Sequence, residues 1–127
     1  MAFLSASRIA ALAIVCLAVL MHAYEQVVNS ASPSLGWFLW AMLPYGVCLM
    51  SLLWFRSGVP AAIGAAVALV WDAITHYEVF VHPTSSTAAL ALIFVPLWNA
   101  LLFSPIAMLI AWLVVRKRTR VSAASAK

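Results

Sequence analysis

The sequence predicts an all-α membrane protein: a four-helix transmembrane bundle with short loops and with both termini in the cytoplasm. Of its 127 residues, 67% are hydrophobic and 8% are charged, whereas an average soluble domain is roughly half apolar and a quarter charged. A soluble domain this small leaves much of its surface in water and cannot bury so much apolar surface. Four apolar runs alternate with short polar breaks, and each reaches the roughly 20 residues that a helix needs to cross the hydrocarbon. The length allows one domain, residues 1–127.

Because lipid offers no hydrogen bonds to bare backbone, the four runs should be helices. We expect them at residues 7–28, 35–55, 60–81 and 86–115. The break at residues 29–34 supplies serines that cap the second helix. Pro60 stands at the start of the third helix, where a missing N–H costs little. The break at residues 82–87 supplies hydroxyl caps for the fourth helix, and residues 116–127 form a tail that is basic and then flexible.

Three prolines lie inside the predicted helices: Pro44 in the second, and Pro96 and Pro105 in the fourth. Interior prolines free carbonyl groups and bend membrane helices. We expect a kinked or tilted fourth helix, and a hinge that moves in transport is the alternative.

The distribution of Lys and Arg sets the orientation. Arg8 lies at the start of the first run, Arg56 separates the second from the third, and a basic cluster follows the fourth, whereas the other two breaks contain no Lys or Arg. By the positive-inside rule both termini are cytoplasmic, as in a bacterial-type inner membrane protein. Tryptophans then fall at both membrane boundaries, with Trp37 and Trp40 outside and Trp54 and Trp112 inside.

The first run also resembles a signal peptide, since Arg8 precedes an apolar stretch at residues 9–20. A small-residue cleavage site is poor here, because Met21 and His22 precede Ala23. We therefore expect this helix to be retained.

The basic cluster beside the fourth helix comprises Arg116, Lys117, Arg118 and Arg120. Such a cluster at the end of an apolar helix is typical of a lipid-headgroup anchor. Nothing else in the chain resembles a nucleic-acid-binding module, so we expect membrane lipids and no nucleic acid as partners.

All three acids and all three histidines fall in two windows, residues 22–25 and 72–82. Asp72 needs most explanation. Counted from Pro60 it lies roughly 18 Å into a hydrocarbon layer roughly 30 Å thick. A carboxylate near mid-bilayer costs roughly 2.5–3.5 kcal/mol, so Asp72 should be protonated, paired or facing a wet cavity.

Helical spacing suggests where Asp72 points. Gly64, Ala68, Asp72 and His76 follow one another at four-residue steps, and small residues at such spacing let another helix approach closely. The first helix has a similar stripe that includes His22 and Glu25. If the two stripes face each other, one polar cluster forms: His22, Glu25, Asp72 and His76. Tyr45 and Asn99 are possible supporting residues, and Glu78 and His82 form a secondary pair nearer the outer surface.

Three interpretations of this cluster remain open. It can hold the bundle together through polar pairs between helices. It can relay protons or cations, for which intramembrane His and carboxylate groups are typical. It can also bind a metal through His22, His76, Asp72 and Glu25, or haem iron through His22 and His76, although the spacing fits none of the stronger metal motifs.

Our hypothesis is therefore a non-catalytic accessory subunit or a minimal transporter of unknown substrate, with the cluster as its polar centre. The alternative is a membrane metal- or haem-binding redox protein. The sequence contains no phosphate-binding loop and no nucleophile motif, so we favour no enzymatic activity, and no cofactor is predicted. A bundle this small has little room for a path of its own, so we expect a homo-oligomer or a larger membrane partner.

Overall fold

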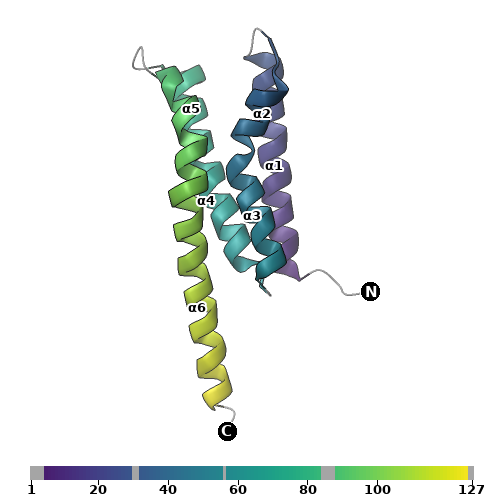
Figure 1. Ribbon diagram of the computed structural model, residues 1–127, viewed down its shortest axis with the longest axis vertical. Helices are drawn as coiled ribbons and strands as arrows, with labels where there is room; N and C mark the ends of the chain where they lie inside the picture. The colour runs from purple at the N-terminus through teal and green to yellow at the C-terminus, as the bar shows by residue number, and fades with distance from the viewer. Residues whose placement is uncertain (1–4, 30–31, 56, 84–87, 126–127) are drawn as a thin grey trace.

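The computed structural model describes residues 5–29, 32–55, 57–83 and 88–125, and every regular element within them is helical. Arg56 and the predicted caps at residues 84–87 lie outside these ranges. In chain order the elements, with η for a π-helical segment, are α1 (Ala6–Val28), α2 (Leu35–Ala41), α3 (Leu43–Trp54), α4 (Val59–His76), η1 (Tyr77–Val81), α5 (Ala88–Trp98), η2 (Asn99–Phe103) and α6 (Ser104–Ser125). Figure 1 shows them as one elongated bundle.

Three continuous helices in the described ranges are long and apolar enough to cross a membrane: Ala6–Val28, Val59–Val81 and Leu90–Ser122. The bent pair α2 and α3 makes a fourth if the two count as one span. The expectation of an all-α chain is therefore confirmed within the residues described, and three to four of their helices are candidate spans against the four expected.

The second predicted helix, residues 35–55, is broken. α2 and α3 meet at Met42 with a bend of 55°. Pro44 occupies the first turn of α3, and its ring excludes the carbonyl of Trp40, four residues earlier, from a continuous helix. A proline expected to kink this helix thus separates it into two pieces.

The fourth predicted helix, residues 86–115, contains a π-helical segment between two prolines. Pro96 lies inside α5, η2 follows, and Pro105 is the second residue of α6. Each proline removes an N–H and crowds the carbonyl four residues before it. Widening the helix to a π turn relieves that crowding without ending the helix, and such turns are frequent at functional sites.

The helix does not stop at residue 115. α6 continues through the basic cluster to Ser125, whereas the sequence predicts that the helix ends at residue 115 and that a basic and then flexible tail follows at residues 116–127. Arg and Lys have good helix propensity, which favours a helix through Arg116, Lys117 and Arg118. Figure 1 shows the end of α6 reaching past the other helices on the side where the chain begins.

α4 lies at the centre of the bundle, in contact with α1, α3, α5 and α6. Its buried face consists mostly of small residues, and α1 presents a similar face to it. The buried residues of α4 are Pro60, Ala61, Gly64, Ala65, Ala68, Asp72 and Thr75, and those of α1 are Ala11, Val15, Ala18 and His22. The predicted stripes therefore face inward, while large apolar side chains such as Leu20, Leu53 and Leu101 cover the outside.

Gly64 marks the closest approach of α4 to its neighbours. A Cβ atom at this position would lie 2.6 Å from Met108 Cγ and 3.1 Å from Cys48 Sγ. Ser104 Oγ donates a hydrogen bond to Gly64 O at 3.2 Å, which joins α6 to α4 just below the polar cluster.

The end where the chain begins is held by Arg8. Its guanidinium donates to the carbonyls of Leu52 and Phe55, each at 3.4 Å, which are among the carbonyls left free at the end of α3. The α1 backbone also approaches the turn before α4 closely, since a Cβ on Gly58 would lie 2.6 Å from Arg8 N. Arg8 therefore connects α1 to the end of α3 within the bundle.

Candidate functional site: a buried carboxylate joined to all helical layers

Asp72 is buried in the centre of the bundle, with 5% of its surface exposed. It follows Ala68 by four residues on the buried face of α4, so the packing of small residues that brings the helices together also encloses the carboxylate. Three side chains from three other elements bind it, and each donates to or shares a hydrogen with a carboxyl oxygen: His22, Tyr45 and Asn99.

Tyr45 and Asn99 supply neutral donors. Tyr45 Oη donates to Asp72 Oδ2 at 2.7 Å, and Asn99 Nδ2 donates to Asp72 Oδ1 at 3.0 Å. Both residues sit where proline interrupts a helix, Tyr45 just after Pro44 and Asn99 at the start of η2. The structure thus places both predicted supporting residues against Asp72.

His22 joins the two acids of the cluster. Its Nε2 lies 3.1 Å from Asp72 Oδ2, and its Nδ1 lies 2.7 Å from Glu25 Oε2. Glu25 is three residues further along α1 and therefore on the same face. Both ring nitrogens of one imidazole are consequently engaged by carboxyl groups, one on its own helix and one on α4.

His76 extends the series to the edge of the bundle. Its Nδ1 lies 2.7 Å from Glu25 Oε1, so Glu25 uses one oxygen for each histidine. The exposed fraction of the side chain falls steadily along the series: 23% for His76, 12% for Glu25, 9% for His22 and 3% for Asp72. The four predicted cluster residues thus form a continuous chain from the surface to the core.

A count of hydrogens shows what the three imidazole–carboxyl contacts require if all of them are hydrogen bonds. Each of its three imidazole–carboxyl contacts needs one hydrogen between nitrogen and oxygen. Neutral His22 and neutral His76 carry one N–H each, which supplies two. The third must be a second N–H on His22 or a hydroxyl on Glu25 or Asp72. The arrangement therefore requires one proton beyond those of neutral imidazoles and ionised carboxyls.

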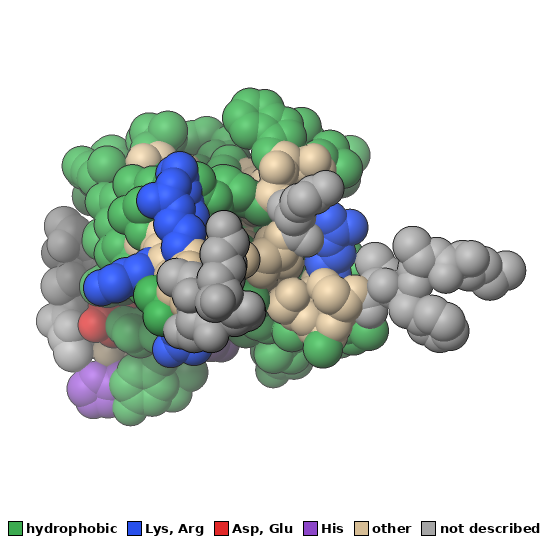
Figure 2. All heavy atoms as spheres, turned by 90° about the horizontal axis from the view of Figure 1, so that it is seen from below, with side chains coloured by type: hydrophobic (Ala, Val, Ile, Leu, Met, Phe, Trp, Pro, Cys, Tyr) green, Lys and Arg blue, Asp and Glu red, His purple; other side chains and the backbone are tan. Residues whose placement is uncertain are grey.

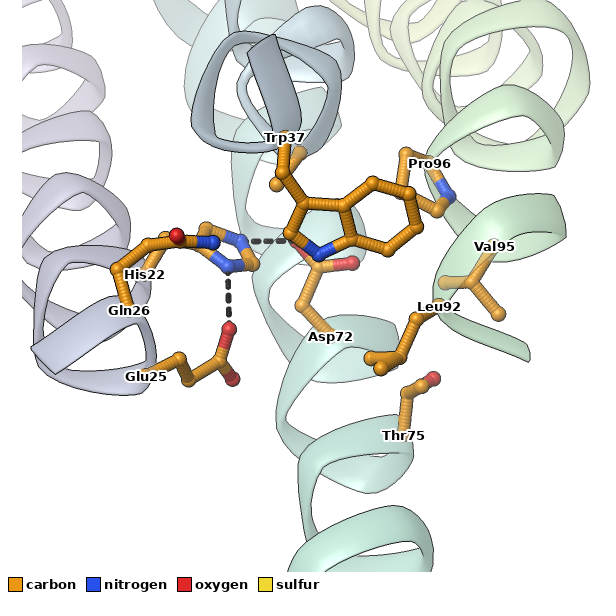
Figure 3. Close-up of a pocket in the computed structure, with 10 residues that line it drawn as sticks. His22, Glu25, Gln26, Trp37, Asp72, Thr75, Leu92, Val95 and Pro96 are labelled. Atoms are coloured by element: carbon orange, nitrogen blue, oxygen red, sulfur yellow. Dashed lines mark hydrogen bonds and ion pairs between the residues drawn. The ribbon is translucent and has the colours of Figure 1, made fainter. Parts of the chain in front are cut away.

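A small cavity of about 30 Å³ adjoins the series. A water molecule needs roughly 10–15 Å³ by this measure, so the space suits one or two waters and no larger solute. Figure 3 shows Trp37 and Pro96 on one side of it and His22 and Asp72 pointing toward it. Thr75, Gln26 and Trp37 line the cavity although the sequence did not single them out for it; the signal available for Thr75 was its position three residues after Asp72 on the same face.

Asn99 has one further property. Its Nδ2 also lies within 3.4 Å of Ala68 O, but its Oδ1 is buried and accepts no hydrogen bond from the described residues. Buried polar atoms without a partner are uncommon in folded proteins. The carboxamide therefore has capacity to accept another donor at the centre of the bundle.

Glu78 and His82 are not part of the cluster. Both are exposed and lie at η1 or just after it, where they border a separate surface groove with Val70 and Tyr77. The π-helical turn changes their relation from the α-helical spacing expected, and His82 N–H donates to Tyr77 O at 2.8 Å. His82 instead stacks on the Tyr77 ring, with an interplanar angle of 4°.

The geometry of the cluster does not support the metal or haem interpretation. Within the described ranges no group of three or more His, Cys, Asp or Glu residues is arranged to hold a metal ion. The Nδ1 atoms of His22 and His76 contact the two oxygens of the Glu25 carboxyl group, and His22 Nε2 contacts Asp72. Ligation of a metal by His22 therefore requires one of its carboxyl contacts to open first.

The predicted lipid-headgroup anchor is far from this cluster. Arg116, Lys117, Arg118 and Arg120 are exposed along the last turns of α6, at the opposite end of the bundle from the α1–α2 connection (Figure 1).

No protein-family model, curated protein or solved structure matches the chain.

Proposed function

We propose that this chain is a four-span membrane protein in which the series His76–Glu25–His22–Asp72 relays protons between the outer surface and the middle of the bilayer. The bent pair α2–α3 counts as one span in this proposal. Support comes from the candidate spans and from the Lys and Arg residues, which lie near or beyond the span ends on one side only. That pattern directs both termini to the cytoplasm and His76 to the outside.

The observation that carries the proposal is the position of His22 between two carboxyl groups. An imidazole can take a proton at one ring nitrogen and release one from the other. Here those nitrogens lie 2.7 Å from Glu25 and 3.1 Å from Asp72, which gives a direct path with no gap. The extra proton that the contacts require is the one that moves.

The path is open toward one side of the membrane. The chain has no other His or carboxyl group between Asp72 and the cytoplasmic end, because its remaining ones are Glu78 and His82. A proton on Asp72 therefore leaves inward only when the helices rearrange. The π segment η2, flanked by Pro96 and Pro105 and carrying Asn99, is the element that we propose bends in that step.

Anything larger than water needs a path outside this monomer, because the cavity beside Asp72 is about 30 Å³. We propose that the protein acts as a minimal transporter in a homo-oligomer or with a larger membrane partner, and that its own bundle supplies the proton-binding centre.

The competing function is that of an accessory subunit in which the cluster is structural. Its support is that Asp72 is well satisfied, with partners on both oxygens. Such a role needs only hydrogen bonds, which amide side chains also provide. The alternation of two imidazoles with two carboxyls favours the relay, because each of these groups both binds and releases protons.

Proton flux into liposomes tests the proposal. Purified protein is reconstituted with a pH-sensitive dye inside, and a potassium diffusion potential drives protons inward. We compare wild type with Asp72→Asn, which keeps the size of the side chain but removes its proton-accepting oxygen, and with Glu78→Gln as the control on an exposed acid. Wild type and Glu78→Gln should conduct equally, and Asp72→Asn should match empty liposomes. Equal flux in wild type and Asp72→Asn, or wild-type flux no higher than that of empty liposomes, overturns the proposed proton transport through Asp72.

A further inference from the structure

A second pocket, of about 300 Å³, lies at the other end of the bundle, between the end of α3 and the middle of α6. Its walls combine aromatic rings with one cation and one hydroxyl. The residues that supply these groups are Trp54, Phe55, Ser57, Trp112 and Arg116. None of them belongs to the proton series.

The aromatic wall is fixed on one side and open on the other. Phe55 and Trp112 pack with ring centroids 6.3 Å apart, which joins α3 to α6. Trp54 is 83% exposed, so nearly its whole indole is available to a ligand. An indole beside water favours an environment that is apolar at one end and polar at the other.

The cation sits over this wall. The Arg116 guanidinium carbon lies 5.1 Å from the centroid of the Trp112 ring, within the range of a cation–π contact. This contact orients the guanidinium plane at the mouth of the pocket and leaves its N–H groups for an anion. Ser57 Oγ accepts a hydrogen bond from Val59 N–H at 3.2 Å, which holds the hydroxyl at the same mouth.

The charged side chains described at this end of the bundle are basic. The three acids, Glu25, Asp72 and Glu78, all belong to the opposite half of the bundle, and no Lys or Arg in the described ranges forms an ion pair with them. Figure 2 shows basic side chains gathered on the face viewed from below. Because Arg8 is occupied by α3 carbonyls, the positive charge that the described residues offer to a ligand at this end comes from α6.

We propose that this pocket binds one anionic phospholipid of the cytoplasmic leaflet. Its phosphate contacts Arg116 and Ser57, and an acyl chain covers Trp54. The adjoining Lys117, Arg118 and Arg120 attract the negative leaflet without contacting this lipid. A free phosphate satisfies the cation but leaves the exposed indole in water, so the combination of groups favours a lipid. This site rests on membrane insertion, the first part of the proposed function, and does not depend on the relay.

Tryptophan quenching tests the site. The protein in neutral detergent is titrated with dibrominated phosphatidylglycerol or with dibrominated phosphatidylcholine of the same chains, whose bromines quench nearby indoles. Wild type should prefer the anionic lipid. Because a direct hydrogen bond between charged groups contributes about tenfold or more in affinity, Arg116→Gln should lose about tenfold of that preference. Arg120→Gln removes the same charge outside the pocket and should stay within about twofold of wild type.

Three results overturn this site: no preference of wild type for the anionic lipid, equal losses in the two variants, or displacement of the lipid by millimolar inorganic phosphate. Equal losses indicate a diffuse basic surface, and displacement indicates a small-anion site. The outcome is separable from the relay. Loss of proton conduction in Asp72→Asn leaves the lipid preference intact, and Arg116→Gln leaves the outer proton path intact.

Discussion

His22 Nε2 lies 3.1 Å from Asp72 Oδ2, which joins α1 to α4 across 50 residues of sequence. This contact is the junction between the partly exposed half of the series, formed by His76 and Glu25, and the buried carboxyl group with its donors Tyr45 and Asn99. Both the stability of the bundle and the proposed movement of protons depend on it.

Tyr45→Phe should destabilise the bundle because it removes the shortest hydrogen bond to Asp72, 2.7 Å long. Polar contacts between membrane helices contribute about 0.6–2 kcal/mol, and we expect a loss in that range. Unfolding in mixed micelles by increasing SDS measures it. The matched control is Tyr24→Phe, since Tyr24 is 57% exposed and should lose almost nothing. Equal effects of the two substitutions would show that the Tyr45 hydroxyl does not bind a buried acceptor.

Gly64→Ala tests the close packing of α4 against α3 and α6. The added methyl would lie 2.6 Å from Met108 Cγ, and overpacking of this kind costs about 1–3 kcal/mol. Gly46→Ala is the control, because nothing lies within 4 Å of its added methyl. Both substitutions gain up to about 1 kcal/mol of helix propensity, so the difference between the two variants isolates the packing cost. The same unfolding assay should show Gly64→Ala less stable than Gly46→Ala by about 1–3 kcal/mol. The reverse order would contradict the close packing of α4 against α3 and α6 at Gly64.

Reporter fusions test the orientation. A green fluorescent protein joined after Lys127 should fluoresce, since it folds in the cytoplasm, and alkaline phosphatase at the same point should be inactive. Alkaline phosphatase inserted in the connection between α1 and α2 should be active. The physical reason is that Lys and Arg occur at the start of the first span, between the second and third, and at the end of the fourth. Activity of phosphatase at the C-terminus would show that this terminus lies outside, and the proposed relay would then run from the cytoplasmic side.

Chelation tests the metal and haem alternative. Because each contact of His22 and His76 is made to a carboxyl group of the chain, removal of metal should leave the cluster in place. Dialysis of the purified protein against EDTA should therefore change neither its unfolding midpoint nor its visible spectrum. A lowered midpoint that zinc restores, or a Soret band in the starting material, would instead favour ligation by His22 and His76.

The sequence alone was sufficient to place the main side chains of the cluster. Four-residue spacing aligned Asp72 with Gly64 and Ala68, and a carboxylate on a small-residue face has to point at another helix because lipid cannot solvate it. The same reasoning paired His22 with Glu25 by their spacing of three. What spacing could not supply was rotation about each helix axis, which decides that His22, rather than His76, bonds Asp72.

Irregular backbone was harder to predict. Prolines at 44, 96 and 105 indicated bends, yet one produced a break between α2 and α3 and the others a π segment. The choice depends on contacts between helices near each proline. Trp40 Nε1, for example, donates to Ile93 O at 3.1 Å on another helix, a contact that no local pattern encodes. The end of α6 was also misplaced. The predicted helix ended at residue 115 because the basic cluster begins there, whereas the helix continues to Ser125.

The most direct test of the relay follows the carboxyl group of Asp72 by infrared difference spectroscopy in vesicles of uniform orientation. The band is assigned by its absence in Asp72→Asn, and the pH is changed on one side at a time. We predict that acidifying the outer side changes the Asp72 band in wild type, that acidifying the inner side does not, and that His22→Gln abolishes the outer response while the control His82→Gln keeps it. An Asp72 band that responds equally from both sides, or that is unaffected by the loss of His22, would contradict a proton path through His22.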